Sequence, residues 1–202
     1  AREYLSARKL SKNTVIKFGL GYAPDTKDAL LSLLRTKGYK DDEIIDAGLA
    51  VTRNDVAVDK YRNRVMFPII DTSGNIIAFG GRVLDDSKPK YLNSPDSPVF
   101  NKSRNLFAMN FAKKSKAGRM ILAEGYMDVI AMHQAGFDNA VATLGTALTS
   151  QQAKLIGDYA KKVIISYDSD EAGQKATRRA MEIFEKEDVT VQVLQMTGAK
   201  EP

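Results

Sequence analysis

Three acidic residues lie at the carboxyl ends of two predicted strands. Glu124 comes directly after the apolar run Met120–Ala123, and Asp168 and Asp170 follow the apolar run Val163–Tyr167. Loops at the carboxyl ends of parallel strands aim their side chains into one crevice, so we expect these acids to lie close together. Converging carboxylates repel one another unless a cation lies between them. The spacing therefore predicts a site for divalent metal ions.

The donor types favour a hard cation and phosphate chemistry. Magnesium binds through one or two carboxylates, keeps several waters and completes its shell with substrate phosphates. Two such ions can stabilise both the attacking and the leaving oxygen of an in-line phosphoryl displacement. Helix capping is the simpler alternative, since Asp170 or Glu171 could satisfy the first turn of the following helix. Capping needs only one acid, however, and it does not explain the glutamate after a separate strand.

Composition excludes several other classes of site. The chain has 202 residues and no cysteine, so neither a disulfide framework nor a zinc ribbon can form within it. Its one histidine, His133, is expected on the surface of a helix. No apolar run approaches the length of a membrane span and no signal peptide opens the chain. We therefore expect a cytoplasmic protein without a membrane partner.

Positive charge is concentrated just before the acids. Residues 80–119 hold nine Lys and Arg against three acids, whereas the whole chain has a net charge of only +5. A basic segment next to an acidic metal site suits an enzyme that processes a polyanion, because the lysines and arginines can bind its phosphates. A solvated charged face is the plainer alternative, and charge alone leaves both open.

The first part of the chain predicts a mixed α/β subdomain over residues 1–118. Helices are expected over 25–36, with Leu30, Leu33 and Leu34 on one face, and over 41–47. Strands over 64–70 and 75–79 should form a hairpin through the turn at 71–74. Pro68 indicates an edge or bulged strand, because proline cannot donate to the ladder.

From residue 119 onward strands and helices alternate. Strands are expected over 120–123, 140–143, 163–167 and 189–194, separated by helices over 127–135, 150–159 and 171–186. Strands separated by helices of this length predict a mostly parallel, Rossmann-like sheet with right-handed crossovers. We place the subdomain boundary near Gly118, so the second subdomain covers residues 119–202. Both ends of the chain are expected to be cut from something longer.

The acidic motifs resemble the Toprim domain of topoisomerases, DnaG-type primases, certain nucleases and recombination mediators. They are Glu124-Gly125 after a strand and Asp168-x-Asp170-x-x-Gly173 after a later strand. Further blocks resemble, in order, the basic-motif region and the Toprim domain of bacterial DNA primases. These blocks are Lys60-Tyr-Arg-Asn-Arg-Val-Met-Phe-Pro-Ile69, Phe79-Gly-Gly-Arg-Val-Leu84, Lys90-Tyr-Leu-Asn-Ser-Pro95, Phe100-Asn-Lys102, Glu124-Gly-Tyr-Met-Asp-Val129 and Leu144-Gly-Thr-Ala147.

This resemblance implies a nucleotidyltransferase that makes RNA primers on single-stranded DNA from ribonucleoside triphosphates. Glu124 would act as the catalytic acid, as metal ligand or general base, and Asp168 and Asp170 would help hold two or more Mg²⁺ or Mn²⁺ ions. Primases carry a further Asp-Pro-Asp motif, and Glu201-Pro202 stands in its place. Glu201 is therefore a weaker candidate metal ligand. A Toprim nuclease or topoisomerase fragment, and a non-catalytic Toprim DNA-binding module, are the alternatives.

The resemblance also assigns six residues to nucleotide or template binding. They are Lys17, Arg82, Lys90, Tyr91, Asn93 and Lys102. Lysine at position 17 replaces an arginine that is frequent in relatives, which keeps the charge but loses the planar fork. Tyr91 could instead pack on the hairpin. Gly80 and Gly81 could admit the template or merely form a bulge.

Other open alternatives concern charged residues and partners. Arg62 and Arg64 could simply solvate a strand edge, and Asp128 could cap its helix or support the metal ligands. The family implies a zinc-binding domain before this region, so we expect no zinc within the present residues. It also implies a later domain that binds the replicative helicase at the replication fork. Guanosine tetra- and pentaphosphate, known inhibitors of the family, would suit the same basic and metal-bearing cleft.

Overall fold

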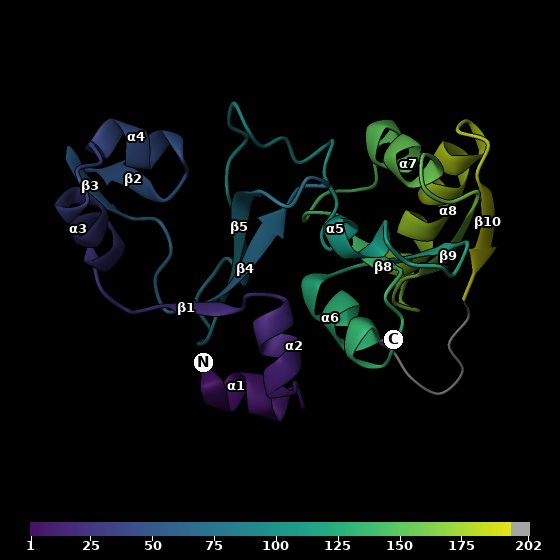
Figure 1. The fold of residues 1–202 in the computed structure, drawn as a ribbon, viewed down its shortest axis with the longest axis horizontal. Coiled ribbons are helices and arrows are strands. Elements are labelled where there is room, and N and C mark those ends of the chain that lie inside the picture. Colours follow the sequence, from purple (N-terminus) through teal and green to yellow (C-terminus); the bar gives the residue numbers. More distant parts are fainter. Residues whose placement is uncertain (195–202) are drawn as a thin grey trace. The chain divides into compact units, whose positions relative to one another are not determined.

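The protein is described by a computed structural model over residues 1–194, and its chain forms two compact units. The first unit comprises Ala1–Ile69 and Ile76–Asn101, and the second comprises Ile70–Asn75 and the chain from Lys102 onward. Colours in Figure 1 follow the sequence, so the elements of each unit can be found there. Within residues 1–194, no helix is both long and apolar enough to cross a bilayer.

The division between the units falls between Asn101 and Lys102, earlier than the boundary expected near Gly118. Backbone bonds explain why the segment after Lys102 groups with the second unit. The Phe107 amide donates to the Ala142 carbonyl at 2.9 Å, and the Lys113 ammonium donates to the Thr72 carbonyl. The proposal of functional subdomains at 1–118 and 119–202 is a separate matter and stays a prediction.

The first unit is mixed α/β, as expected. Its strands β1, β4, β5 and β6 form one sheet in the order β1-β4-β5-β6, and β2 pairs with β3 in a small antiparallel ribbon. The elements are α1 (Arg2–Ala7), α2 (Lys12–Lys17), β1 (Gly21–Ala23), α3 (Ala29–Thr36), α4 (Asp41–Asp46), β2 (Ala50–Arg53), β3 (Val56–Asp59), β4 (Arg64–Ile70), β5 (Ile76–Val83) and β6 (Tyr91–Asn93).

The hairpin between β4 and β5 is confirmed. Asp71 sets its turn, because its carboxylate accepts from the Asn75 amide at 2.8 Å while its own amide donates to the Asn75 carbonyl. Pro68 lies in β4, which has neighbours on both sides, but the pairing with the short β1 ends at Met66. The missing proline donor therefore falls where β1 no longer pairs.

The prediction that Leu33 lies on the apolar face of α3 is wrong. Leu31, not Leu33, is fully buried, and it packs in a small core with Ile44 and Ala50. Leu33 is 52% exposed. Asp59 explains this rotation, because its two carboxylate oxygens accept from the Leu30 and Leu31 amides at 2.9 and 2.8 Å. A strand residue thus caps the helix, which the local sequence could not reveal.

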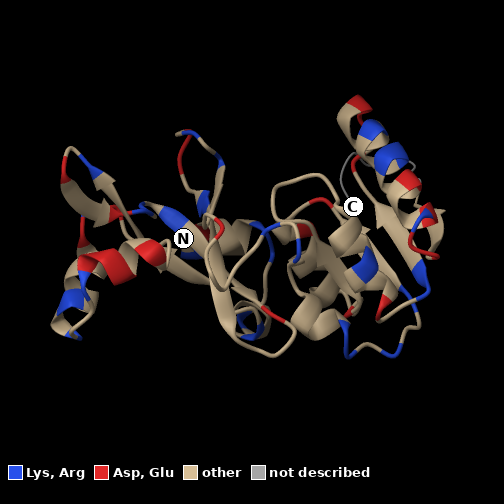
Figure 2. Cartoon of the chain, turned by 90° about the horizontal axis from the view of Figure 1, so that it is seen from above, with Lys and Arg blue, Asp and Glu red and all other residues tan. Residues whose placement is uncertain are grey.

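The second unit has the predicted parallel sheet. Its strands lie in the order β10-β9-β7-β8, and all three pairings are parallel. Helix α7 packs against α8, and Figure 2 shows both basic and acidic residues along α8. The elements are α5 (Met109–Ala112), β7 (Met120–Ala123), α6 (Tyr126–Gln134), β8 (Ala140–Ala142), α7 (Ser150–Gly157), β9 (Lys162–Ser166), α8 (Glu171–Glu185) and β10 (Thr190–Val193).

Local signals account for the helix starts in this unit. Thr149 accepts from the Gln152 amide at 3.1 Å, and the Gln152 side chain accepts from the Thr149 amide at 3.1 Å. This reciprocal pair forms a capping box at the start of α7.

The surface position expected for His133 is wrong, because its side chain is buried and Nε2 lies 2.9 Å from the Ala140 carbonyl. The ring therefore ties α6 to β8.

Candidate functional site

The strand order of the second unit brings Glu124 to Asp168. Strands β7 and β9 are parallel neighbours, with Ala123 paired to Ser166 at their carboxyl ends. Glu124 is the next residue after β7, and its Oε1 accepts a hydrogen bond from the Asp168 amide at 3.0 Å. The two motifs therefore meet at one edge of the sheet, as their positions after parallel strands predicted.

Gly173 allows the loop after β9 to close tightly around this contact. A Cβ at position 173 would lie 2.1 Å from the Asp168 carbonyl oxygen and 3.0 Å from Glu124 Oε1. Any side chain larger than hydrogen would therefore overlap the backbone of Asp168. The glycine of the second motif is required by this close approach.

Asp170 caps the helix that follows. Its Oδ1 accepts from the Gly173 amide at 2.8 Å, which confirms the capping alternative for this residue. Asp128 does the same for α6, where Oδ2 accepts from the Gly125 amide at 2.9 Å. A carboxylate has two oxygens and several lone pairs, so capping through one oxygen leaves acceptor capacity for a second partner.

Burial and neighbouring acids raise the proton affinity of Glu124. Burial is the main cause that raises the pKa of Glu124, and the charges of Asp168, Asp170 and Asp128 raise it further. The Asp168 amide acts in the opposite direction by donating to the ionised carboxylate. Repulsion between these acids is what a cation would relieve.

The donor set fits a hard divalent cation. Every candidate ligand is a carboxylate oxygen, and burial together with the neighbouring acids disfavours the ionised form of Glu124. Among residues 1–194, however, no three His or acidic side chains converge closely enough to hold one ion together. These carboxylates therefore suit a hard divalent cation whose coordination shell is completed by water and phosphate oxygens. Glu201, the fourth candidate, lies outside the described residues.

A cavity of about 420 Å³ opens beside the acids. Its lining includes Glu124, Asp170, Tyr167, Thr143, Thr146 and Arg179. Burial and the charge of Glu124 raise the pKa of Tyr167, so its phenol stays neutral. Sequence reasoning missed Arg179 and the two threonines. The spacing of Ala172, Ala176 and Arg179 along α8 is the signal that could have placed Arg179 at this cavity.

Three of the predicted binding residues share two strands of the first unit. Arg82 on β5 pairs directly with Tyr91 on β6, and Gly80 pairs with Asn93. The Tyr91 ring lies 6.5 Å from the Phe67 ring and remains 36% exposed. Tyr91 therefore packs on the hairpin, as one alternative held, while part of its surface stays open.

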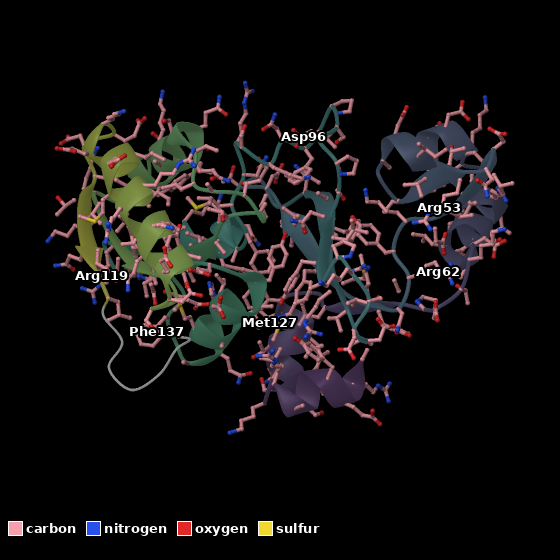
Figure 3. The ribbon with its side chains drawn as sticks, turned by 180° about the vertical axis from the view of Figure 1, so that it is seen from behind. Arg53, Arg62, Asp96, Arg119, Met127 and Phe137 are labelled. Carbon is pink, nitrogen blue, oxygen red and sulfur yellow. The ribbon has the colours of Figure 1, made fainter. Side chains whose placement is uncertain are left out.

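Arg64 holds the segment that carries Lys90. Its Nη1 donates to the Gly81 carbonyl at 3.1 Å and to the Pro89 carbonyl at 3.0 Å. The solvating role considered for Arg64 is wrong, because the side chain is buried under these carbonyls. Arg62, labelled in Figure 3, does lie at the surface, where it pairs with Asp25 at 3.1 Å.

Gly81 is required by packing in the first unit. A Cβ there would lie 2.9 Å from the Tyr61 ring and 3.0 Å from Arg64 Cδ. This contact favours a packing reason for Gly81 over an approach of the template.

Lys17, a predicted binding residue, is the last residue of α2. Its ammonium lies 5.7 Å from the centre of the Phe18 ring.

Lys102 belongs to the second unit, where its backbone is fixed to α7. The Gln152 side chain donates to the Lys102 carbonyl at 2.8 Å and to the Asn105 carbonyl at 2.9 Å. The Thr149 hydroxyl donates to the Ser103 carbonyl at 2.6 Å. The cap of α7 thus also anchors the segment that follows Lys102.

Comparisons with known families cover nearly the whole chain. The family described as the DNA primase catalytic core, N-terminal domain, matches residues 1–113. A family described as Toprim-like matches residues 121–202.

Curated relatives and solved structures agree with these matches. The DNA primase of Clostridium acetobutylicum is 50% identical over 203 residues, which is 100% of this chain and 34% of that protein. The DNA primase of Deinococcus radiodurans is 44% identical over 207 residues, which is 100% of this chain and 36% of that protein. The chain thus spans about a third of the length of these relatives.

Two solved structures illustrate the likeness. The Escherichia coli primase catalytic core matches with a TM-score of 0.90 at 38% identity, covering 100% of this chain and 66% of that one. A DnaG primase catalytic domain bound to single-stranded DNA matches with a TM-score of 0.88 at 39% identity, covering 99% and 64%.

Proposed function

The chain belongs to the bacterial DnaG-type DNA primase family, and on that premise we propose that it is the RNA-polymerising core of a primase. It would join ribonucleoside triphosphates into a short RNA primer on a single-stranded DNA template, with release of pyrophosphate. The contact between Glu124 and Asp168 at the ends of two parallel strands carries this proposal. Such a centre needs acids from both motifs, and the fold supplies them side by side.

The acids would divide the work of a nucleotidyl transfer. Glu124, Asp168 and Asp170 would hold two or more Mg²⁺ or Mn²⁺ ions, with Glu201 as a further candidate. When bound, the ions supply charge stabilisation to the attacking and leaving oxygens. Glu124 has a raised pKa, which suits a group that takes up the proton of the primer 3′-hydroxyl.

Basic and polar residues would bind the phosphates and the template. Arg82, Lys90 and Lys102 would neutralise phosphate charge, with Lys17 as a further cation. Tyr91 has an exposed part on which a base could stack, and Asn93 lies on the same strand. The structure of a related catalytic domain with single-stranded DNA supports template binding by this region.

A template-dependent primer assay tests this function. The Glu124→Gln variant should keep the fold and lose at least about 100-fold in labelled ribonucleotide incorporation with Mn²⁺. Cleavage of DNA by the wild type without polymerisation would instead indicate a Toprim nuclease or topoisomerase fragment. DNA binding without either reaction would indicate a non-catalytic binding module.

Regulation and partners follow from the same assignment. We propose that guanosine tetra- and pentaphosphate compete with nucleotides, because their clustered phosphates suit the same cations. Calorimetric titration of a Lys90→Ala, Lys102→Ala double variant checks this, and unchanged affinity would contradict it. The replicative helicase would bind through a part of the relatives that this chain does not cover, at the replication fork in the cytoplasm.

We also propose a functional boundary near Gly118, with residues 1–118 binding nucleotide and template and residues 119–202 forming the catalytic subdomain. The two matched families cover 1–113 and 121–202, on either side of this glycine, which supports the proposal. Separate expression of the two parts, with DNA binding assayed for each, tests it. DNA binding confined to the second part would contradict it.

A further inference from the structure

Tyr4, in the first helix of the chain, stacks on the side chain of Arg82. The guanidinium carbon of Arg82 lies 4.3 Å from the centre of the Tyr4 ring. Tyr4 comes from α1 and Arg82 from β5, and both belong to the first unit. A guanidinium at this distance from an aromatic face is attracted by the ring quadrupole. The contact therefore links the first helix to the strand that carries a predicted phosphate-binding residue.

Few other contacts hold the Arg82 guanidinium. Its Nη1 donates to the Val83 carbonyl at 2.8 Å, whereas Nε is buried and finds no hydrogen-bond partner within residues 1–194. No acid in this described part of the chain forms an ion pair with it. Its positive charge is thus supported by a ring and one carbonyl, and it stays available to an anion.

The ring of Tyr4, not its hydroxyl, accounts for its position. The Tyr4 hydroxyl is buried, and among the described residues it has no hydrogen-bond partner. A buried hydroxyl without a partner is unfavourable, so it cannot be what fixes the side chain there. Phenylalanine should therefore serve at this position as well as tyrosine.

We propose that Tyr4 is a positioning residue that fixes the plane of the Arg82 guanidinium for phosphate binding. This inference rests on the proposed function, which assigns Arg82 to the phosphates of nucleotide or template. A guanidinium can bind a phosphate through two parallel hydrogen bonds only when its plane is correctly oriented. Stacking engages only the face of the guanidinium, so it fixes that plane and leaves the remaining Nη N–H groups to the phosphate, and it reduces the entropy lost on binding.

Arg8 lies near the same ring and needs its own control. Its guanidinium carbon lies 5.7 Å from the centre of the Tyr4 ring, and the residue is exposed. A variant that lacks the ring therefore withdraws support from two cations. Arg8→Ala measures the smaller share of the effect that passes through Arg8.

Binding of a fluorescently labelled single-stranded DNA oligonucleotide tests the inference. Arg82→Ala should weaken binding, Tyr4→Leu should weaken it by about 3- to 10-fold, and Tyr4→Phe should leave it unchanged. A double-mutant cycle then separates positioning from general structure. In an Arg82→Ala background, Tyr4→Leu should cost no more than Arg8→Ala does, whereas it should keep its full effect in a Lys90→Ala background.

Fluorinated phenylalanines at position 4 keep the test valid if Tyr4→Leu does not fold. They weaken the ring quadrupole at nearly constant shape, so affinity should fall stepwise with fluorine content while the unfolding temperature stays constant. Affinity that does not follow fluorine content, or an equal Tyr4→Leu loss in both backgrounds, would overturn the inference alone. Wild-type binding by Arg82→Ala would instead show that the role assigned to Arg82 is wrong, and the inference would fall with it.

Discussion

The amide of Asp168 donates to Oε1 of Glu124 at 3.0 Å, so the backbone of one acidic motif fixes the side chain of the other. The bond joins residues that follow two different strands, and it holds Glu124 where burial and the neighbouring acids raise its pKa. The geometry of Glu124 therefore depends on the loop after β9 as much as on its own strand.

Replacing Glu124 with glutamine should stabilise the metal-free protein at neutral pH. The pKa of Glu124 is raised in the folded state, so protonation stabilises the fold; this contribution is complete below the ordinary glutamate pKa of about 4.3 and is lost as pH rises through the folded pKa. At pH 7, Glu124→Gln should raise the unfolding temperature by up to about 2 °C, because solvent around the partly exposed carboxyl weakens the effect. Mn²⁺ should stabilise the wild type and not the variant, and Glu185→Gln, on the exposed part of α8, is the matched control.

The helix-capping role and the metal-binding role of Asp170 can be tested separately. Asparagine caps helices about as well as aspartate, so Asp170→Asn should keep stability within a few tenths of a kcal/mol, whereas Asp170→Ala should lose about 1 kcal/mol. Both variants should lose Mn²⁺ binding, measured by calorimetry, and primer synthesis. Retained activity in Asp170→Asn would show that Asp170 only caps α8.

Gly173→Ala should damage the site through the backbone. The new Cβ would lie 2.1 Å from the Asp168 carbonyl oxygen, so the loop must move and the bond to Glu124 must lengthen. We expect a loss of about 1–3 kcal/mol in urea unfolding, with activity falling further than stability. Gly21→Ala is the control, because its Cβ would meet Met66 at an ordinary 3.9 Å. Equal behaviour of the two variants would contradict the prediction.

Lys90→Ala should reduce the salt dependence of single-stranded DNA binding. Each phosphate contact contributes about −0.7 to the slope of log affinity against log salt on single strands. The slope should therefore become shallower by about that amount, measured by titration at several salt concentrations. Lys37→Ala removes an exposed lysine outside the basic segment and should leave the slope unchanged.

Sequence patterns predicted the second unit well because its signals are local. Apolar runs gave the four parallel strands, and the acids after β7 and β9 had to meet once those strands were neighbours. The caps at Thr149 and Asp170 also lie within three residues of the amides that they bind. Apolar runs and capping residues of this kind can be recognised within a short stretch of sequence.

The failures all involve partners that lie outside the helix or strand in question. Asp59 caps α3 and thereby rotates it so that Leu31 is buried, which no pattern within the helix could show. Arg64 and His133 are buried because backbone carbonyls of other strands or loops accept their hydrogen bonds. Polarity alone favoured the surface for His133 and left a solvating role open for Arg64. Tyr4 was likewise not singled out, because its contact with Arg82 joins the first helix to β5.

Position 152, outside the acidic centre, should tolerate very few substitutions of its glutamine. Its buried side chain caps α7 and also holds the carbonyls of Lys102 and Asn105. No other amino acid supplies an acceptor and two donors at this reach, since asparagine is one carbon shorter and glutamate lacks the donors. In a saturation mutagenesis of the chain, we therefore expect position 152 to reject nearly every replacement.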